Sequence, residues 1–332
     1  MMPAVSLGCW DLKGDADSTP IAVKAALDEG YYALDDAQIY GNEHVIGPIV
    51  GSFTKDQMKA VAKFDPTQDG TPFKVVSEDK FLESFEKPHG KPEDDRAVFV
   101  TTKIWCTKFT PEGIRAQVEQ HLKDFKRSSI DLLLLHVPGD HYLWAKDENS
   151  VHDPRNAETR IICWKTLEAL YAEGKVRLIG VSNYMAKHLQ PLIQDIEKRK
   201  AAGDKHARLP FVNQIEISAF CQVGDELEQL CKQNDIIFTS YSSLGSAKCV
   251  AEYMAHEVIQ STATKHKVTA ANVLLRWCLQ KGYMILPRST KAERVKENYG
   301  PTMSFKLDQE DMEAISKLNT GRRALLDPHE IA

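Results

Sequence analysis

The sequence predicts a single α/β domain folded as an eight-stranded (β/α)8 (TIM) barrel. Short apolar segments alternate with amphipathic segments along nearly all of its 332 residues. Several apolar segments are continuously hydrophobic, as strands buried on both faces of a parallel sheet are. Strands separated by helical segments indicate βαβ units, and a count of eight favours closure into a barrel.

The expected strands are Val5–Trp10, Ala33–Asp36, Val98–Lys103, Ile130–His136, Arg177–Ser182, Phe211–Glu216, Ile236–Tyr241 and Tyr283–Pro287. The expected helices are Ile21–Glu29, Glu112–Phe125, Glu158–Glu173, Met185–Lys200, Asp225–Asn234 and Ala270–Lys281. Thr19 and Thr110 each precede a proline, which predicts an N-cap followed by proline at the first helical position. An open Rossmann sheet is the alternative, but no G-x-G-x-x-G motif follows any strand, so the barrel is favoured.

A polar segment at about 51–97 interrupts this alternation. It contains four prolines and mixed charges, and we expect an irregular surface insertion with one short helix near Glu78–Glu86. It follows a helix that begins near Glu43 and precedes the third strand, which places it at the amino-terminal face of the barrel. Catalysis in this fold occurs at the opposite face, so the insertion is predicted to be non-catalytic.

Composition excludes several classes of function. The chain is 42% hydrophobic and 27% charged, as ordinary globular proteins are, and its net charge of −5 without a basic block argues against nucleic acid as a partner. No apolar run approaches the roughly 18 residues of a membrane helix, and no secretory signal is visible. Seven scattered cysteines without C-x-x-C spacing fit reduced thiols in a cytoplasmic protein, and no metal site is expected.

Four polar residues fall at the ends of three expected strands. Asp35 ends the second strand, and Tyr40 lies five residues further on; Lys103 ends the third strand and His136 the fourth. Each residue alone has a structural explanation: a turn cap (Asp35 or Asp36), packing, a lysine reaching solvent, or a structural histidine. Strand carboxyl ends form the catalytic rim of such barrels, so their coincidence there favours a functional interpretation.

These four side chains together can form a general acid aimed at a carbonyl oxygen. A phenol has a pKa near 10 and is a poor acid at neutral pH. An adjacent ammonium is expected to lower that pKa by stabilising the phenolate, and a carboxylate keeps the ammonium charged. The imidazole can hydrogen-bond the carbonyl oxygen and hold it against the tyrosine hydroxyl, so that a hydride donor is the missing component.

The segment after the last strand predicts a binding site for a phosphate. Thr290 and Glu293 match a T-x-x-E capping box, and a helix N-terminus attracts anions through its free N–H groups and dipole. Arg288, Ser289 and Arg294 surround it, and the loops after strands 7 and 8 often bind phosphate in barrels. A 2′-phosphate would suit this site, which favours NADP over NAD; the alternative is a solvated basic helix start.

Other strand ends supply further groups for a dinucleotide. Ser182, Asn183 and Gln214 offer donors and acceptors for a carboxamide, and Tyr241 offers a ring for stacking. Along the expected path of the pyrophosphate lie Ser242, Leu244 and Ser246.

These motifs together resemble the aldo-keto reductase superfamily, and within it most closely the aldose and aldehyde reductases. The resemblance is collinear from Leu7 to about Arg322. The motif LDDAQIYGNE places the catalytic aspartate and tyrosine at Asp35 and Tyr40, VTTKIW places the lysine at Lys103, and LLLLHVP the histidine at His136. The cofactor motifs GVSNY, NQIE, SYSSLGS and LPRSTKAERVKEN follow in order, the last ending at Asn298. The resemblance implies a barrel that reduces aldehydes or ketones with NADPH, and we expect a monomer.

The sequence departs from the family pattern around the substrate and cofactor. Val137 replaces a usual tryptophan of the substrate pocket, whereas Trp10 and Trp105 remain. The loop after SYSSLG is short, since a helical pattern begins within a few residues of Ser246. The tail LDPHEIA lacks an aromatic-rich ending, and Arg288 replaces a more usual lysine, which adds bidentate phosphate geometry.

Two other functions remain as alternatives. Lys103 would form a Schiff base in a barrel aldolase, but the paired Asp35 should keep it protonated and therefore a poor nucleophile. A cofactor-sensing binding protein without catalysis is the second alternative, and the complete set of four polar residues argues against it.

Overall fold

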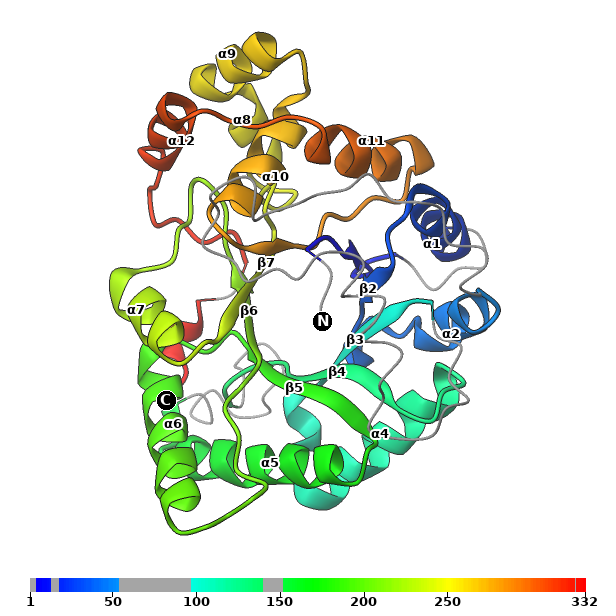
Figure 1. The fold of residues 1–332 in the computed structure, drawn as a ribbon, viewed down its shortest axis with the longest axis vertical. Helices are drawn as coiled ribbons and strands as arrows, with labels where there is room; N and C mark the ends of the chain where they lie inside the picture. Colours follow the sequence, from blue (N-terminus) through cyan, green and yellow to red (C-terminus); the bar gives the residue numbers. More distant parts are fainter. Residues whose placement is uncertain (1–3, 13–17, 54–96, 140–151, 326) are drawn as a thin grey trace.

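The computed structural model describes residues 4–12, 18–53, 97–139, 152–325 and 327–332. Its eight parallel strands follow one another around a closed ring (Figure 1): β1 Leu7–Gly8, β2 Ala33–Asp35, β3 Phe99–Ile104, β4 Ile130–Leu135, β5 Val176–Ser182, β6 Val212–Glu216, β7 Ile237–Tyr241 and β8 Met284–Ile285. A parallel bridge between Val5 and Ile285 joins the first strand region to the last and closes the barrel. The predicted fold is confirmed, although β1 and β8 are shorter than expected.

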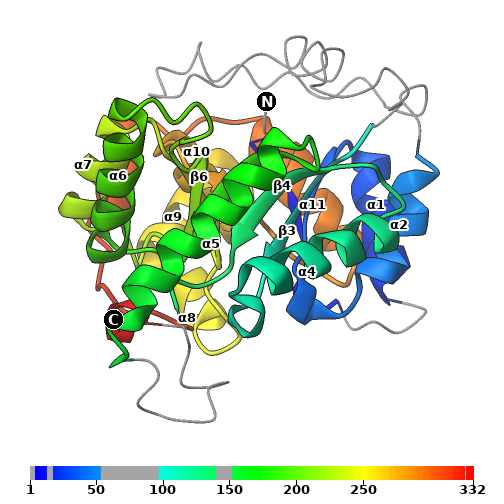
Figure 2. The same ribbon diagram turned by 90° about the horizontal axis from the view of Figure 1, so that it is seen from below.

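Helices surround the strands, and in the turned view α4 and α5 lie across the front of the barrel (Figure 2). They are α1 Ser18–Glu29, α2 Glu43–Gly51, α4 Pro111–Asp124, α5 Arg155–Ala172, α6 Ala186–Ala201, α7 Asp225–Gln233, α8 Val250–Ala255, α9 Glu257–His266, α10 Ala270–Gln280, α11 Ala292–Met303 and α12 Gln309–Ser316. Thr110 caps α4 as predicted, since its hydroxyl accepts from the Gly113 N–H at 3.0 Å. Thr19 does not cap α1, because the helix begins at Ser18 and the Thr19 hydroxyl donates to the Leu12 carbonyl.

The strands bury both faces, each in its own apolar cluster. Along β4, Leu132 and Leu134 belong to a small cluster with Ala33, Phe99, Val212 and Met284 inside the barrel. Leu133 and Leu135 alternate with them and pack in the larger cluster beneath the helices. This alternation is the two-residue period of a strand, and it fixes which side chains face the barrel interior.

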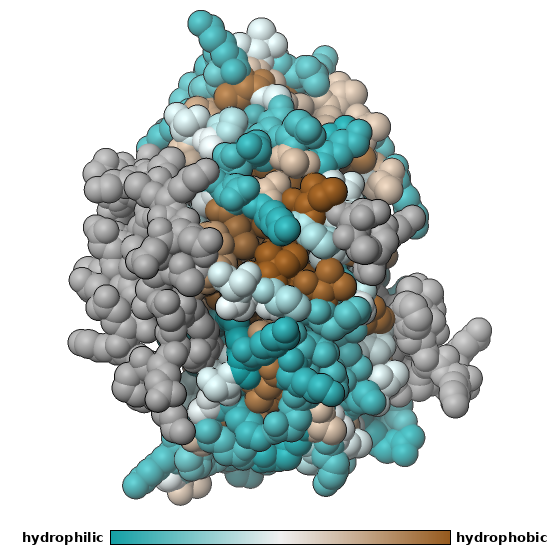
Figure 3. Space-filling view, turned by 90° about the vertical axis from the view of Figure 1, so that its right-hand side faces the viewer, coloured by the Kyte–Doolittle hydropathy of each residue, from teal (hydrophilic) through white to brown (hydrophobic). Residues whose placement is uncertain are grey.

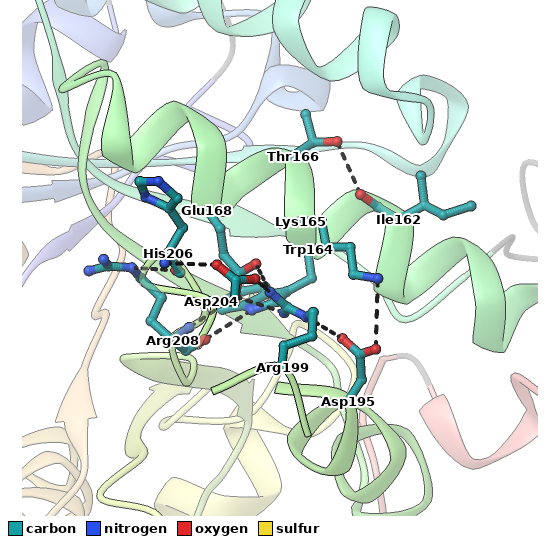
Figure 4. A network of polar contacts seen from close by, with 10 residues as sticks. All are labelled: Ile162, Trp164, Lys165, Thr166, Glu168, Asp195, Arg199, Asp204, His206 and Arg208. Carbon is teal, nitrogen blue, oxygen red and sulfur yellow. Dashed lines mark hydrogen bonds and ion pairs between the residues drawn. The ribbon is translucent and has the colours of Figure 1, made fainter. Parts of the chain in front are cut away.

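Ion pairs reinforce the outer helical layer. The Arg199 guanidinium of α6 contacts Glu168 of α5 at 2.7 Å, Asp195 at 2.7 Å and Asp204 at 2.8 Å (Figure 4). Glu168 also accepts from the Arg208 N–H, so the chain leading into β6 is tied to both helices. Figure 3 shows a mainly hydrophilic exterior on the side of α1 and α2, with hydrophobic residues gathered near its centre.

The last two expectations about the fold concern the polar insertion and membrane-spanning helices. The insertion at 51–97 lies almost wholly outside the described residues, so its position and its helix near Glu78–Glu86 stay predictions. Within the described ranges, no helix has the length and apolarity to cross a membrane.

Candidate active site

The inward-facing register of the strands brings the predicted polar residues to one rim. Asp35 lies two residues beyond the interior residue Ala33, and Gln214 two beyond Val212. Lys103 shares the face of Phe99, and His136 follows Leu134 in the same way. The interior is therefore apolar below and polar at the carboxyl ends of β2, β3, β4 and β6, where barrels place their chemistry.

Lys103 is the centre of this polar group. Its ammonium donates to Asp35 Oδ1 at 2.6 Å, to the Asp36 carbonyl at 2.8 Å and to the Tyr40 hydroxyl oxygen at 3.2 Å. These contacts use all three of its N–H donors. The Tyr40 oxygen therefore accepts from lysine, and among the described residues no acceptor is recorded for the phenolic proton itself. That proton is free to be donated to a molecule in the barrel mouth.

The charges of this group are fixed by burial and by each other. Lys103 is completely buried, and burial is the largest single effect on its pKa and opposes the charge. The charges and hydrogen bonds of Asp35 and Tyr40 together outweigh burial and raise the pKa of the ammonium. For Tyr40, burial raises the pKa to about 12, and the opposing effect of Lys103 is smaller. The expectation of a lowered tyrosine pKa is therefore wrong for this structure, because withdrawal of the phenol from water outweighs the ammonium.

His136 lies beside the tyrosine as a neutral imidazole. Its ring centroid is 6.0 Å from that of Tyr40 and 5.0 Å from that of Trp105, both edge to face. Burial and the Lys103 charge lower its pKa well below 6.5. Its Nδ1 atom is buried without a hydrogen-bond partner in the part of the chain that the structure describes. A neutral imidazole can hydrogen-bond a carbonyl oxygen without adding charge to the site.

Hydrogen bonds link four of the predicted cofactor residues, Ser182, Asn183, Gln214 and Tyr241, to this group. Gln214 Nε2 donates to Asp35 Oδ2 at 2.6 Å, and the Ser182 hydroxyl donates to the Gln214 carbonyl at 2.8 Å. Asn183 donates to the His136 carbonyl at 2.9 Å and accepts from the Tyr241 hydroxyl at 2.6 Å. The Asp35 contact occupies one N–H of the Gln214 amide, so its remaining polar atoms are those available to a ligand.

Sequence reasoning missed the residues that hold the tyrosine segment. Tyr40 ends the short 3-10 helix η1 (Gln38–Tyr40), and the Gln38 side chain accepts from the Trp105 N–H at 3.2 Å. Glu43, at the start of α2, accepts from the Thr102 hydroxyl at 2.5 Å and contacts His121 Nδ1 at 2.8 Å. One signal in the sequence is closeness to the predicted catalytic residues: Glu43 lies three residues after Tyr40, and Thr102 directly precedes Lys103.

The side chain of Asp36 belongs to the wall behind the site. It is buried, it accepts from the Ala37 N–H at 2.9 Å, and burial together with the nearby Glu43 raises its pKa well above the usual carboxyl range. Asp35, not Asp36, is thus the carboxylate that faces the lysine ammonium.

The groups predicted to hold a phosphate lie on the loop after β8. Arg288 is exposed and Ser289 is buried, and the Ser289 hydroxyl accepts from the Lys291 N–H at 3.1 Å. The predicted Thr290–Glu293 capping box is wrong. Because Ser289 forms this turn and Lys291 is extended, α11 begins only at Ala292, with Lys291 as N-cap and without a side-chain cap bond.

The remaining predicted residues have these positions. On α11, Arg294 is exposed and Asn298 is buried. Ser242, Leu244 and Ser246 are half-buried after β7. The short loop is confirmed, since α8 begins at Val250.

The three residues predicted to line the substrate pocket differ in how exposed they are. Trp10 is 51% exposed and Trp105 is half-buried, so both present ring surface at the rim. Val137 is only 1% exposed, because it alternates with the inward-facing His136, and this burial gives no support to a pocket-lining role.

The profile of the family described as "Aldo/keto reductase family" matches residues 4–320 of this chain. The chain belongs to the aldo/keto reductase family. It is 31% identical to the 9,11-endoperoxide prostaglandin H2 reductase of Trypanosoma cruzi, covering 98% of this chain and 91% of that protein. It is 30% identical to the glyoxal reductase of Bacillus subtilis, over 99% and 94% of the two chains. Family membership makes this protein an oxidoreductase and supports reduction of carbonyl groups.

A solved structure with the same fold is similar to this chain over nearly its whole length. The crystal structure of a Gox0644 mutant in complex with NADPH superposes with a TM-score of 0.71 at 26% identity, covering 99% of this chain and 94% of that one. Aldo/keto reductases bind a nicotinamide cofactor, and this structural neighbour holds NADPH.

Proposed function

We propose that this aldo/keto reductase uses NADPH to reduce aldehydes, including open-chain aldoses, and some ketones to alcohols. The observation that carries the proposal is the Lys103 ammonium between the Asp35 carboxylate and the Tyr40 hydroxyl oxygen. That arrangement leaves the phenolic proton available to a carbonyl oxygen. Bound NADPH supplies a hydride to the carbonyl carbon.

Side chains of the protein donate the proton and stabilise the negative charge that remains. Tyr40 donates its proton to the carbonyl oxygen as negative charge develops there, and the fixed Lys103 ammonium stabilises the resulting phenolate. The neutral His136 imidazole orients the oxygen toward Tyr40. Because Asp35 keeps Lys103 charged, the lysine lacks the free amine that a Schiff base requires, which favours proton transfer over aldolase chemistry.

The residues at the rim fit a phosphorylated dinucleotide. Arg288 and Arg294 are exposed cations within seven residues of one another, and α11 begins between them in the sequence, at Ala292. The free N–H groups of a helix start attract a phosphate. Tyr241 and Asn183 lie at the ends of β7 and β5, where they would contact the nicotinamide. Ser242 and Ser246 would follow the pyrophosphate.

The test is nucleotide oxidation followed at 340 nm with a panel of aldehydes, ketones and sugars, using NADPH and NADH in parallel. We expect turnover with NADPH and at least one aldehyde. Tyr40→Phe should bind NADPH with unchanged affinity and lose turnover by about 10²- to 10⁴-fold, the usual contribution of a general acid.

Three results would contradict the proposal. Near-normal turnover in Tyr40→Phe would remove the proton donor. NADPH binding without oxidation across the whole panel would instead support a cofactor-sensing protein. A borohydride-trapped covalent adduct on Lys103 would establish the aldolase alternative.

A further inference from the structure

An ion pair joins the segment after β1 to the segment after β8, where the first and last strands meet and close the barrel. Arg288 Nη2 donates to the backbone carbonyl of Asp11 and to Asp11 Oδ2, each at 2.7 Å. Asp11 follows β1 and Arg288 follows β8. These neighbouring segments are close, since the Gly8 N–H donates to the Pro287 carbonyl at 3.1 Å. The pair therefore lies on the same rim as the site described above.

The backbone of Asp11 is set for this contact. Its φ angle is +52°, in the left-handed region that aspartate and asparagine tolerate better than most residues. In this conformation the carbonyl and the carboxylate of one residue both reach the same guanidinium nitrogen. Arg288 is thereby held by a negative charge on the neighbouring loop.

The pair is open to solvent and therefore exchangeable. The Asp11 side chain is 52% exposed and that of Arg288 is 36% exposed. Ion pairs of this kind are weak, because water screens them and because ordering two side chains costs entropy. A phosphate dianion carries more charge than a carboxylate and can displace it from the guanidinium.

We propose that Asp11 competes with the 2′-phosphate of the cofactor for Arg288 and thereby reduces the preference of this protein for NADPH over NADH. The inference rests on the proposed function, because it requires Arg288 to bind that phosphate. NADH lacks the 2′-phosphate, so its binding leaves the Asp11–Arg288 pair intact. NADPH must break the pair before its 2′-phosphate can bind Arg288.

Asp11→Asn is the informative variant. Asparagine keeps the size of the side chain, its tolerance of the left-handed conformation and the backbone carbonyl, and removes only the charge. Dissociation constants for NADPH and NADH are measured by fluorescence titration of the full chain. We expect the Kd for NADPH to fall about two- to five-fold, the range for an exposed ion pair, while the Kd for NADH stays unchanged.

A double-mutant cycle and a matched control complete the experiment. In Asp11→Asn/Arg288→Ala the gain for NADPH should disappear relative to Arg288→Ala alone, because the competing interaction has no partner. Asp235→Asn is the control: Asp235 is exposed, has a φ of +53° and precedes β7 at the opposite end of the barrel. It removes the same charge and should change neither Kd.

The outcomes separate the inference from the proposed function. If Arg288→Ala weakens NADPH selectively but Asp11→Asn leaves the NADPH Kd unchanged or higher, the competition is overturned and the phosphate site stands. An equal gain for both nucleotides would indicate a general charge effect and would also overturn it. If Arg288→Ala leaves NADPH binding unchanged, the phosphate site and the competition both fail.

Discussion

The side-chain amide of Gln214 donates to the Asp35 carboxylate at 2.6 Å, on the oxygen that Lys103 does not use. Asp35 thus divides its two oxygens between a charged donor and a neutral donor. All three residues are buried, so each contact is made in an environment of low polarity. This arrangement couples the strand that carries the lysine's counter-ion to the strand expected to contact the cofactor.

Asp35→Asn should destabilise the protein and impair turnover together. The variant keeps the shape of the side chain but leaves the Lys103 ammonium buried without a carboxylate. Breaking a buried ion pair from one side costs about 3–5 kcal/mol, and we expect a loss of that order in the free energy of unfolding measured with urea. Gln214→Leu is the comparison, because it removes one hydrogen bond to Asp35 and should cost only about 1–3 kcal/mol. A loss below about 1 kcal/mol in Asp35→Asn would show that the ion pair does not hold the site together.

Turnover in the reductive direction should be independent of pH between about 6 and 9. Burial raises the pKa of Tyr40 to about 12, so the acid keeps its proton throughout this range. The pKa of His136 lies well below 6.5, so its ring stays neutral. The measurement is kcat against pH at saturating substrate and nucleotide. An inflection between about pH 6 and 9 that disappears in Tyr40→Phe or His136→Asn would contradict these ionisation states.

Glu43 should act as a positioning residue for Tyr40. Its carboxylate fixes the start of α2 to the Thr102 hydroxyl beside Lys103, at 2.5 Å. Glu43→Gln and Thr102→Val should lower kcat by about 10- to 100-fold through misplacement of the tyrosine, because small displacements of reacting groups have effects of this size. The Kd for NADPH should stay unchanged, since neither residue lies on the cofactor path.

The matched control for that prediction is Thr102→Ser. Serine keeps the hydroxyl that donates to Glu43, so turnover should remain close to that of the original protein. If Thr102→Ser and Thr102→Val lose turnover equally, the threonine methyl group and not the hydrogen bond to Glu43 is what matters. If both keep full turnover, Glu43 does not position Tyr40.

The alternation of short apolar segments with amphipathic segments was sufficient to predict the fold, and the ends of those apolar segments were sufficient to locate the rim residues. The two-residue period of a strand explains why these rim residues share the face of the apolar interior. Ala33 and Asp35 alternate with outward-facing residues in the same way as Phe99 and Lys103, so the apolar interior and the polar rim can be read together. The rim position of His136 follows from Leu134 by the same rule. The face of a strand on which a side chain lies depends only on its position along that strand, so it can be predicted from the sequence.

Contacts between residues that are far apart in the sequence could not be predicted from the pattern within one strand. The Asp11–Arg288 pair joins residues 277 positions apart, and the Glu43–His121 contact joins α2 to α4. The pKa of Tyr40 was predicted in the wrong direction, because the sequence names the neighbouring ammonium but not the depth of burial that outweighs it. The start of α11 was misplaced because Thr290 and Glu293 have the right spacing, whereas Ser289 forms the local turn.

A buried histidine in the helical layer gives a last prediction, concerning stability in acid. His188 of α6 is fully buried, and its Nδ1 accepts from the Met185 N–H at 3.0 Å. The proton is therefore on Nε2, which donates to the Ile331 carbonyl at 2.9 Å. Both nitrogens are satisfied in the neutral ring, and burial lowers the pKa of His188 from 6.5 to about 3.

The sign of the effect follows from proton binding. Below pH 6.5 the unfolded chain binds a proton at His188 that the folded chain excludes, so stability should fall as the pH drops from 6.5 toward 3. One proton corresponds to about 1.4 kcal/mol per pH unit, so this residue alone should remove about 1–3 kcal/mol between pH 6.5 and 4.5. His188→Asn should be less stable at pH 7.5, because asparagine cannot make both hydrogen bonds, yet its stability should decline less steeply in acid. Urea unfolding at pH 7.5, 6.5, 5.5 and 4.5 measures both quantities, with the exposed His206→Asn as the control whose slope should match the original protein. Equal slopes in His188→Asn and the original protein would mean that the folded state accommodates the charged ring and that the contact with Ile331 is not what keeps it neutral.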